Sequence, residues 1–329
     1  MNIHIVVPEA GKDYPRNWNE FLDWFGSEEA CLAFLERLRW GAGFVCPRCG
    51  STAEAYRASR TRLMCRDCKY QGSVTAGTIF EKTRTPLRVW LAAAWYLTNQ
   101  KHGVSALGLQ RVLGLGSYET AWAMLHRFRR AMVRPDRDRL HGVVEVDETY
   151  LALTEREAPA SQQGRKSSTS KILVAVAVEL LEPKGFGRIR LRRIPRDSAA
   201  HVIPFVQDSI EPGAQVRTDG SAAYRSLKDL GYEHQRTVML GSDVPAHVSM
   251  AGVHRVAALV KRWILGTHHG SVQPEHLDAY LDEFVFRFNR RTSSSRGMLF
   301  YRLLQQAVAT APVTYGAVVQ AGAAGRQKG

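Results

Sequence analysis

The chain has 329 residues, with 45 Lys and Arg against 31 Asp and Glu, a formal net charge of +14 and 45% hydrophobic residues. These values are typical of a globular protein, exclude disorder or a coiled coil as the main architecture, and predict two or three domains. No apolar run reaches the roughly 18 residues that a membrane span needs, and the amino terminus lacks the apolar stretch of a secretory leader. The sequence therefore predicts a cytoplasmic protein with no membrane partner.

The positive charge is concentrated in one part of the chain. Residues 41–142 contain 17 basic and 6 acidic side chains, so this stretch supplies eleven of the fourteen net charges. Affinity for a polyanion is dominated by neutralisation of phosphates, and a basic block inside a globular chain is typical of a nucleic-acid-binding module. A GC-rich genome accounts equally well for an excess of arginine, but it does not account for the clustering.

The first expected element is an amphipathic helix over residues 28–40. Apolar residues recur there at intervals of three and four, two glutamates lie in the first turn, and Ser27 is placed to cap the amino terminus. Cys31 falls on the apolar face, so we expect it to pack as a small hydrophobic side chain rather than to bind a metal.

Two Cys-x-x-Cys pairs follow this helix, Cys46 with Cys49 and Cys65 with Cys68, separated by 15 residues. This spacing is typical of a zinc ribbon, in which each pair forms a tight knuckle and Gly50 supplies the positive φ that such a turn needs. Four thiolates would complete a tetrahedron around Zn²⁺ with no open position, so the predicted zinc is structural. Disulfides are the alternative, which a reducing cytoplasm disfavours.

Residues 76–142 are predicted to form a helix-turn-helix domain. Apolar periodicity indicates helices near residues 87–98, 105–113 and 117–132, and two glycines lie in the short connection between the last two. Two helices joined by a short glycine-containing turn are typical of this DNA-binding motif.

Arginines in both of these domains are candidates for phosphate contacts. We expect DNA to be bound by Arg60 and Arg62 in the ribbon, and by Arg127, Arg129 and Arg130 near the end of the last helix. Complementation of the helix dipole accounts for one or two basic residues at a helix carboxyl end, but the whole group favours DNA.

From residue 143 onward the sequence changes to a strand-rich pattern. Three strand-like segments come in succession, and helices and strands alternate after them. Strands are expected near residues 143–150, 172–180, 188–195, 214–219 and 235–240, helices near 198–210, 222–230, 253–265 and 274–289, and a polar loop over 155–170. This order predicts an α/β fold of the RNase H-like class, a mixed sheet flanked by helices, preceded by the zinc ribbon and the helix-turn-helix domain.

Two aspartates mark a candidate catalytic centre in the predicted sheet. Asp147 follows the strand-like run Val-Glu-Val, where an ionised carboxylate is costly unless a cation is nearby, and Asp219 ends another strand at a glycine turn. In an RNase H-like sheet these strands, the first and the fourth, are neighbours, so both carboxylates can bind Mg²⁺. A third ligand should come from the helix after the last strand, where His254 and Lys261 are seven residues apart and share one face.

These residues together resemble a known family. The run Glu-Val-Asp147-Glu-Thr-Tyr, the turn Thr-Asp219-Gly-Ser, and His254 followed by Lys261-Arg262 are similar to motifs of DDE-type bacterial insertion-sequence transposases related to the Merlin superfamily. The zinc ribbon and the helix-turn-helix resemble the amino-terminal half of that family, so the resemblance covers roughly residues 20–305.

The resemblance implies an enzyme that binds the terminal inverted repeats of its element, cleaves them and joins them to target DNA. It implies that Asp147 and Asp219 hold two Mg²⁺ or Mn²⁺ ions, which activate the attacking oxygen and stabilise the leaving one. It also implies that Lys261 and Arg262 contact element-end DNA. Double-stranded DNA is the implied partner, with a homodimer in the DNA complex, nucleoid association and no small-molecule substrate.

The expected domain boundaries follow from these assignments. They are a helical segment over residues 1–40, a zinc ribbon over 41–75, the helix-turn-helix domain over 76–142, the catalytic domain over 143–305 and a flexible tail over 306–329. The tail is expected to fray after its first turns because it is rich in alanine, glycine and valine.

One position departs from the family pattern. The third metal ligand is commonly Glu or Asn, whereas this chain has His254, a softer ligand that suits Mn²⁺ better than Mg²⁺ and carries no negative charge. An ordinary surface histidine is the alternative, in which case Glu145, Glu148 or Asp243 would substitute as ligand.

Two other functions stay open on the sequence alone. A catalytically inactive or domesticated zinc-ribbon and helix-turn-helix regulator gains weight if His254 cannot bind a metal. An RNase H-like structure-specific nuclease would cleave DNA without dependence on the repeat sequence.

Overall fold

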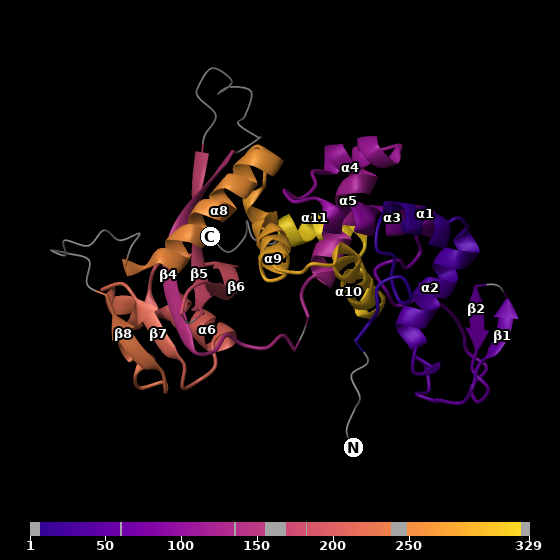
Figure 1. Ribbon diagram of the computed structural model, residues 1–329, viewed down its shortest axis with the longest axis horizontal. Helices are drawn as coiled ribbons and strands as arrows, with labels where there is room; N and C mark the ends of the chain where they lie inside the picture. The colour runs from indigo at the N-terminus through magenta and orange to yellow at the C-terminus, as the bar shows by residue number, and fades with distance from the viewer. Residues whose placement is uncertain are drawn as a thin grey trace. The chain divides into compact units, whose positions relative to one another are not determined.

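The computed structural model describes residues 7–59, 61–134, 136–154, 169–181, 183–237 and 249–323. The chain divides into two compact units, one formed by residues 1–134 and 292–319 and the other by residues 135–291 and 320–329 (Figure 1). Within the described ranges, no helix combines the length and the apolar character that crossing a bilayer requires.

The first unit begins with two short helices, α1 (Trp18–Trp24) and α2 (Glu28–Trp40). The predicted cap of α2 is confirmed, because the Ser27 Oγ accepts a hydrogen bond from the Ala30 N–H at 3.2 Å. Cys31 is completely buried, and burial raises the pKa of its thiol to about 12. The expectation that this cysteine packs as a hydrophobic side chain is therefore confirmed.

Next comes a small antiparallel sheet of three strands, β1 (Tyr56–Ser59), β2 (Arg62–Met64) and β3 (Gln71–Ser73), in the order β1-β2-β3. Its buried core consists of Phe44, Leu63 and two of the cysteines. So few apolar side chains cannot offset the entropy of ordering the segment, so the sheet needs a further source of stability.

Three further helices complete the amino-terminal part of this unit: α3 (Leu87–Asn99), α4 (Ala106–Leu113) and α5 (Tyr118–Ala131). The α4 and α5 helices each have a serine N-cap, and α4 ends at Gly114, whose φ of +62° is the left-handed conformation of a glycine cap. The predicted pair of helices with a short glycine-containing turn is present.

The carboxyl-terminal part differs from the expected tail. Residues 306–309 belong to α10 (Arg296–Ala309), and a further helix, α11 (Tyr315–Ala323), follows it. Phe300 of α10 is fully buried and packs against the rings of four aromatic residues from α1, the α1–α2 turn, α2 and α3, namely Phe21, Phe25, Phe34 and Trp95. The boundary expected at residue 305 is therefore wrong, because the apolar face of α10 belongs to the core of the first unit.

The second unit is built on a five-stranded mixed sheet (Figure 1). Its strands are β4 (Val143–Thr154), β5 (Thr169–Leu180), β6 (Phe186–Arg193), β7 (Gln215–Thr218) and β8 (Glu233–Arg236). The order is β6-β5-β4-β7-β8, in which β4, β5 and β6 pair antiparallel and β7 and β8 are parallel to β4. Three meandering strands followed by two parallel ones confirm the predicted RNase H-like arrangement.

Helices cover both faces of this sheet. Alternate residues of β4 point to opposite sides, so that Val144 and Val146 pack with α6 (Ala199–Ser209) and the 3₁₀ helix η2 (Ala222–Leu227). Leu151 and Leu153 pack on the other face with α8 (Ala251–His268) and α9 (Leu277–Phe288), which follows the short 3₁₀ helix η3 (Pro274–His276).

Several expected bounds differ from the structure in this unit. The helix expected at residues 222–230 is a shorter 3₁₀ helix. The β4–β5 hairpin is longer than expected because its antiparallel register continues to the pair Thr154 and Thr169. Of the polar loop expected over 155–170, residues 155–168 lie outside the described residues.

Candidate functional site

The four cysteines of the two Cys-x-x-Cys pairs converge on one point in the first unit. Their sulfur atoms all lie within 4.8 Å of one another. The Cys46 and Cys68 sulfurs are 3.6 Å apart and the Cys49 and Cys65 sulfurs are 3.7 Å apart. Zn–S bonds of about 2.3 Å in a tetrahedron place sulfurs about 3.8 Å apart, so this donor set fits a structural Zn²⁺.

The two knuckles share one backbone design. The N–H of Gly50 donates to the carbonyl of Cys46 at 2.9 Å, and the N–H of Lys69 donates to the carbonyl of Cys65 at 3.2 Å. Both donors have positive φ, +72° at Gly50 and +58° at Lys69. The prediction for Gly50 is confirmed, whereas nothing in the sequence marks Lys69 as the residue that adopts the same strained conformation in the second knuckle.

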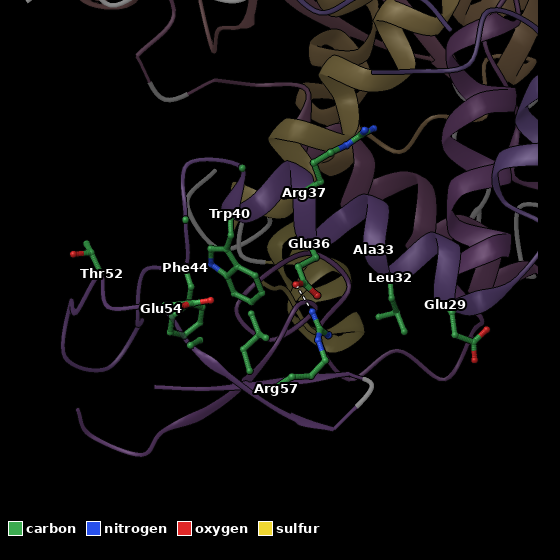
Figure 2. Close-up of a pocket in the computed structure, with 14 residues that line it drawn as sticks. Glu29, Leu32, Ala33, Glu36, Arg37, Trp40, Phe44, Thr52, Glu54 and Arg57 are labelled. Carbon is green, nitrogen blue, oxygen red and sulfur yellow. Dashed lines mark hydrogen bonds and ion pairs between the residues drawn. The ribbon is translucent and has the colours of Figure 1, made fainter. Parts of the chain in front are cut away.

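The zinc ribbon is attached to α2 by polar contacts as well as by packing. Figure 2 shows the groove between them, where the Arg57 guanidinium meets the Glu36 carboxylate at 2.7 Å. Arg39 donates to the carbonyls of Ser73 and Val74 at 3.1 and 2.8 Å. Arg57 therefore serves the ribbon's attachment, while Arg62 on β2 is exposed and Arg60 lies outside the described residues.

The basic side chains at the end of α5 have different environments. Arg130 is exposed, but Arg129 is only 1% exposed, and the half-buried Arg127 guanidinium lies over the Trp90 ring at 5.9 Å. The structure contradicts the expectation that Arg129 contacts DNA. The reason is helical periodicity, since position 129 is four residues after the buried Leu125 and therefore belongs to the inward face.

In the second unit, the two predicted catalytic aspartates follow paired segments of β4 and β7. The parallel pairing of these strands matches Val144 with Val216 and Glu145 with Arg217, where the recorded pairs end. Continuing this register by two residues leads to Asp147 on β4 and to Asp219, the residue just after β7, and the negative charge of Asp219 acts on Asp147. The two carboxylates come from segments more than 70 residues apart in the sequence, and the sheet alone brings them together.

Burial and like charge make the ionised form of Asp147 electrostatically costly. Burial raises the pKa of Asp147, and the negative charges of Asp219 and Asp197 raise it further, while the N–H of Glu148 opposes the shift by donating to its Oδ1 at 2.8 Å. Asp219 accepts a hydrogen bond from the N–H of Ser221 at 2.9 Å. Asp147, Glu148 and Asp219 are half-buried, and grouped carboxylates of this kind supply the oxygen ligands that a hard divalent cation prefers.

Other carboxylates contribute more to this cluster than the sequence predicted. Glu148 points to the η2 side of the sheet, where the buried Tyr224 hydroxyl donates to its Oε1. Burial, with the charges of Asp197, Asp147 and Asp219, raises the pKa of Glu148 to about 7. The sequence analysis did not predict Asp197, which lies just before the Ser198 N-cap of α6. Its place at a strand-to-helix turn is the signal that could have suggested it.

The helix α8 supplies the other side of the centre. His254 and Lys261 both line a cavity of about 360 Å³ together with Asp147 and Glu148, so their expected common face is observed. Asp219 lies outside the lining of this cavity. Among the described residues, no hydrogen-bond partner faces the His254 Nε2, which is shielded from solvent. An unpartnered imidazole nitrogen beside carboxylates is a suitable metal ligand.

Other basic residues near the carboxyl end of this unit differ in their environments. Arg262, the residue after Lys261, is exposed. His268 is buried with its ring edge-on to Trp263 and Tyr280, each 4.8 Å away. Arg291 donates to the carbonyls of Phe288 and Gly187 at 2.9 and 3.2 Å, and it also contacts the carbonyl of Phe186.

Comparison with known proteins agrees with this geometry. The ISXO2-like transposase domain matches residues 139–289, and the transposase zinc-ribbon domain matches residues 26–71, which include α2. An uncharacterised protein in the transposable element ISH50 of Halobacterium salinarum is 27% identical over 279 residues, covering 80% of this chain and 91% of that protein. The two matched domains and the folds that they cover define an insertion-sequence transposase.

Solved structures with some similarity include two complexes of the Mos1 transposase. The strand transfer complex is 14% identical with a TM-score of 0.27, and it covers 70% of this chain and 78% of its own. The pre-cleavage transpososome is 13% identical with a TM-score of 0.25, over 71% and 78%. The chain belongs to the DDE-type transposases of insertion sequences that carry an amino-terminal zinc ribbon.

Proposed function

We propose that this transposase binds the terminal inverted repeats of its element and catalyses divalent-metal-dependent DNA cleavage and strand transfer. The observation that supports the proposal is the parallel register of β4 and β7, because its continuation by two residues leads to Asp147 and Asp219, and the charge of Asp219 acts on Asp147. The matched ISXO2-like transposase domain covers both aspartates.

Two divalent cations are the proposed cofactors of this site. Asp147 and Asp219 would hold Mg²⁺ or Mn²⁺, and His254 would add a ligand from α8 through its unpartnered Nε2. When bound, the ions would activate the attacking water or 3′-oxygen and stabilise the leaving oxygen of an in-line phosphodiester displacement. Lys261, exposed on the same helix face, would bind a phosphate next to the scissile bond.

The first unit would locate the DNA. Residues 41–142 carry a net charge of +11, and the exposed Arg62 and Arg130 are the proposed phosphate contacts there. Arg60 and Arg262 are further candidates, and Arg127 would need to leave its position over Trp90 to take part. Pairing of two element ends requires two catalytic centres, so we propose a homodimer in the DNA complex and association with the nucleoid.

The test is a nicking assay on a duplex that carries the inverted repeats flanking the gene, with Mg²⁺ or Mn²⁺. We expect cuts at the repeat ends that depend on the metal and are lost in the Asp147→Asn variant. The matched control is Asp229→Asn, because Asp229 is an exposed aspartate of the same unit.

Two outcomes would contradict the proposal. Cleavage of duplexes regardless of the repeat sequence would indicate a structure-specific nuclease. Repeat-specific binding without metal-dependent cleavage, with Asp147→Asn equal to the wild type, would indicate a DNA-binding regulator.

A further inference from the structure

A buried glutamate of β4 contacts the beginning of α8. Glu145 is only 3% exposed and lies on the same strand face as Asp147, two residues before it. Its Oε2 accepts a hydrogen bond from the N–H of Val253, in the first turn of α8, at 3.0 Å. The two residues joined by this bond are 108 positions apart in the sequence, so the contact ties the helix to the strand that carries Asp147.

This contact serves as the cap that α8 otherwise lacks. Met250 at the N-cap makes no side-chain capping bond, and the first turn of α8 contains no acidic residue. The first N–H groups of a helix have no partner within the helix, and its positive dipole end favours a negative charge. Glu145 satisfies both requirements from a different element of the fold.

The start of α8 packs closely against side chains of β4 and β5. A Cβ on Gly252 would lie 2.8 Å from the Glu145 Oε2, 3.1 Å from the Leu180 Cδ2 and 3.3 Å from the Val178 Cγ1. A larger residue at this position would therefore displace the Glu145 carboxylate and its apolar neighbours. His254 is the residue directly after Val253, so its ring is oriented from a backbone that Glu145 and Gly252 fix.

We propose that Glu145 is a positioning residue of the catalytic centre, which acts through α8 to hold His254 against Asp147. This inference rests on the proposed function, because it assumes that His254 and Asp147 bind the same cation. It assigns Glu145 a role different from that of a substitute metal ligand, since the carboxylate oxygen that faces α8 is engaged by a backbone N–H.

Mn²⁺ affinity of the full-length chain, measured by electron paramagnetic resonance of the free ion, tests the inference. We expect Glu145→Ala and Gly252→Ala each to weaken Mn²⁺ binding by about tenfold, as removal of a residue that orients a ligand does. Glu145→Gln should bind within about twofold of the wild type, because its amide oxygen accepts the same N–H. Gly266→Ala is the matched control, since a Cβ on that glycine of α8 meets no atom within 4 Å.

A double-mutant cycle separates positioning from general destabilisation. If Glu145 acts through His254, adding His254→Ala to Glu145→Ala should weaken Mn²⁺ binding by less than about twofold more. Additive losses, an unchanged Mn²⁺ affinity with only a lower Tm, or a Glu145→Gln variant as weak as Glu145→Ala would each overturn the positioning role. Failure of the proposed function has a different signature, which is Mn²⁺ binding that Asp147→Ala does not weaken.

Discussion

The zinc ribbon and the carboxylate centre both gather several ionisable side chains at one point, but they use the chain differently. The four cysteines lie within residues 46–68, and two similar knuckles aim them at each other. The proposed carboxylate centre would draw Asp147, Asp219 and His254 from three separate parts of the chain: β4, the residue after β7, and α8.

This difference indicates where residues that orient the ligands of each site are found. A local site needs little beyond its own turns, because the ligands and the backbone that orients them are the same few residues. A dispersed site needs residues that hold its elements in register. The proposed residues of this kind are Glu145 of β4, which accepts a hydrogen bond from the first turn of α8, and Tyr224, whose hydroxyl donates to Glu148.

Removal of the zinc is expected to cause the largest loss of stability. Because the ribbon has a very small core, a Cys65→Ser substitution or a strong chelator should unfold residues 41–75, with a loss on the order of the 10 to 16 kcal/mol that structural zinc contributes in small domains. Amide NMR signals of the ribbon should collapse while those of β4 to β8 stay dispersed. A ribbon that keeps its signals without zinc would contradict the structural role.

The second-largest expected effect is a loss of catalysis without unfolding of the second unit. Asp147→Asn should lower the rate of strand cleavage by about 10³-fold, equivalent to about 4 kcal/mol of transition-state stabilisation. The same change should keep or raise the Tm by a few degrees, because it removes a buried charge that Asp219 and Asp197 repel. A clear fall in Tm together with lost cleavage would instead mean that Asp147 supports the fold.

The two centres should also respond to pH with opposite signs. The pKa of Glu148 is raised from 4.5 to about 7, so the folded chain binds more protons than the unfolded chain between these values. Stability of the metal-free second unit should therefore decline as pH rises through this window, by up to about 3 kcal/mol. The zinc ribbon should gain stability with rising pH, because its ligands must be deprotonated.

Urea unfolding between pH 5 and pH 8, followed in each unit, measures both slopes. The Glu148→Gln variant is the control, because it removes the titrating carboxyl and should flatten the slope of the second unit. A flat profile in the wild-type second unit, or one that rises with pH, would contradict the electrostatic description of the carboxylate cluster.

The smallest expected effect concerns single phosphate contacts in the first unit. Arg62→Ala and Arg130→Ala should each weaken DNA binding a few-fold and reduce the slope of log K against log salt by about one. Arg16→Ala is the control, since Arg16 is exposed outside the basic stretch and pairs with Glu20 at 2.6 Å. Equal slopes for all three variants would place the DNA elsewhere on the surface.

The features that sequence could predict are those that depend on nearby residues or on strand order. The knuckle cysteines, the Ser27 cap and the strand order that makes β4 and β7 neighbours all belong to this class. Each is determined by spacing, by hydrogen bonding within one turn, or by a fold whose neighbouring strands are known in advance.

The features that sequence could not predict depend on which surface an apolar or polar face meets. The apolar face of α10 had to be buried, but nothing in it specifies the aromatic residues of the first unit as its partner. Arginine is a residue type that often contacts DNA, but Arg129 lies on the inward face of its helix. This position, rather than the residue type, determines its burial. The bond between Glu145 and Val253 joins residues 108 positions apart and leaves no mark in either segment.

We propose that Asp147 and Asp219 form one divalent-metal centre. Iron-mediated backbone cleavage is a direct test of whether both residues lie next to the same bound ion. Fe²⁺ loaded into the site, with ascorbate and peroxide, should cut the full-length chain close to the bound ion. We expect fragments that end near residues 147, 219 and 254, which excess Mn²⁺ suppresses and Asp147→Asn abolishes. Cuts confined to other segments, or cuts near only one of the two aspartates, would contradict it.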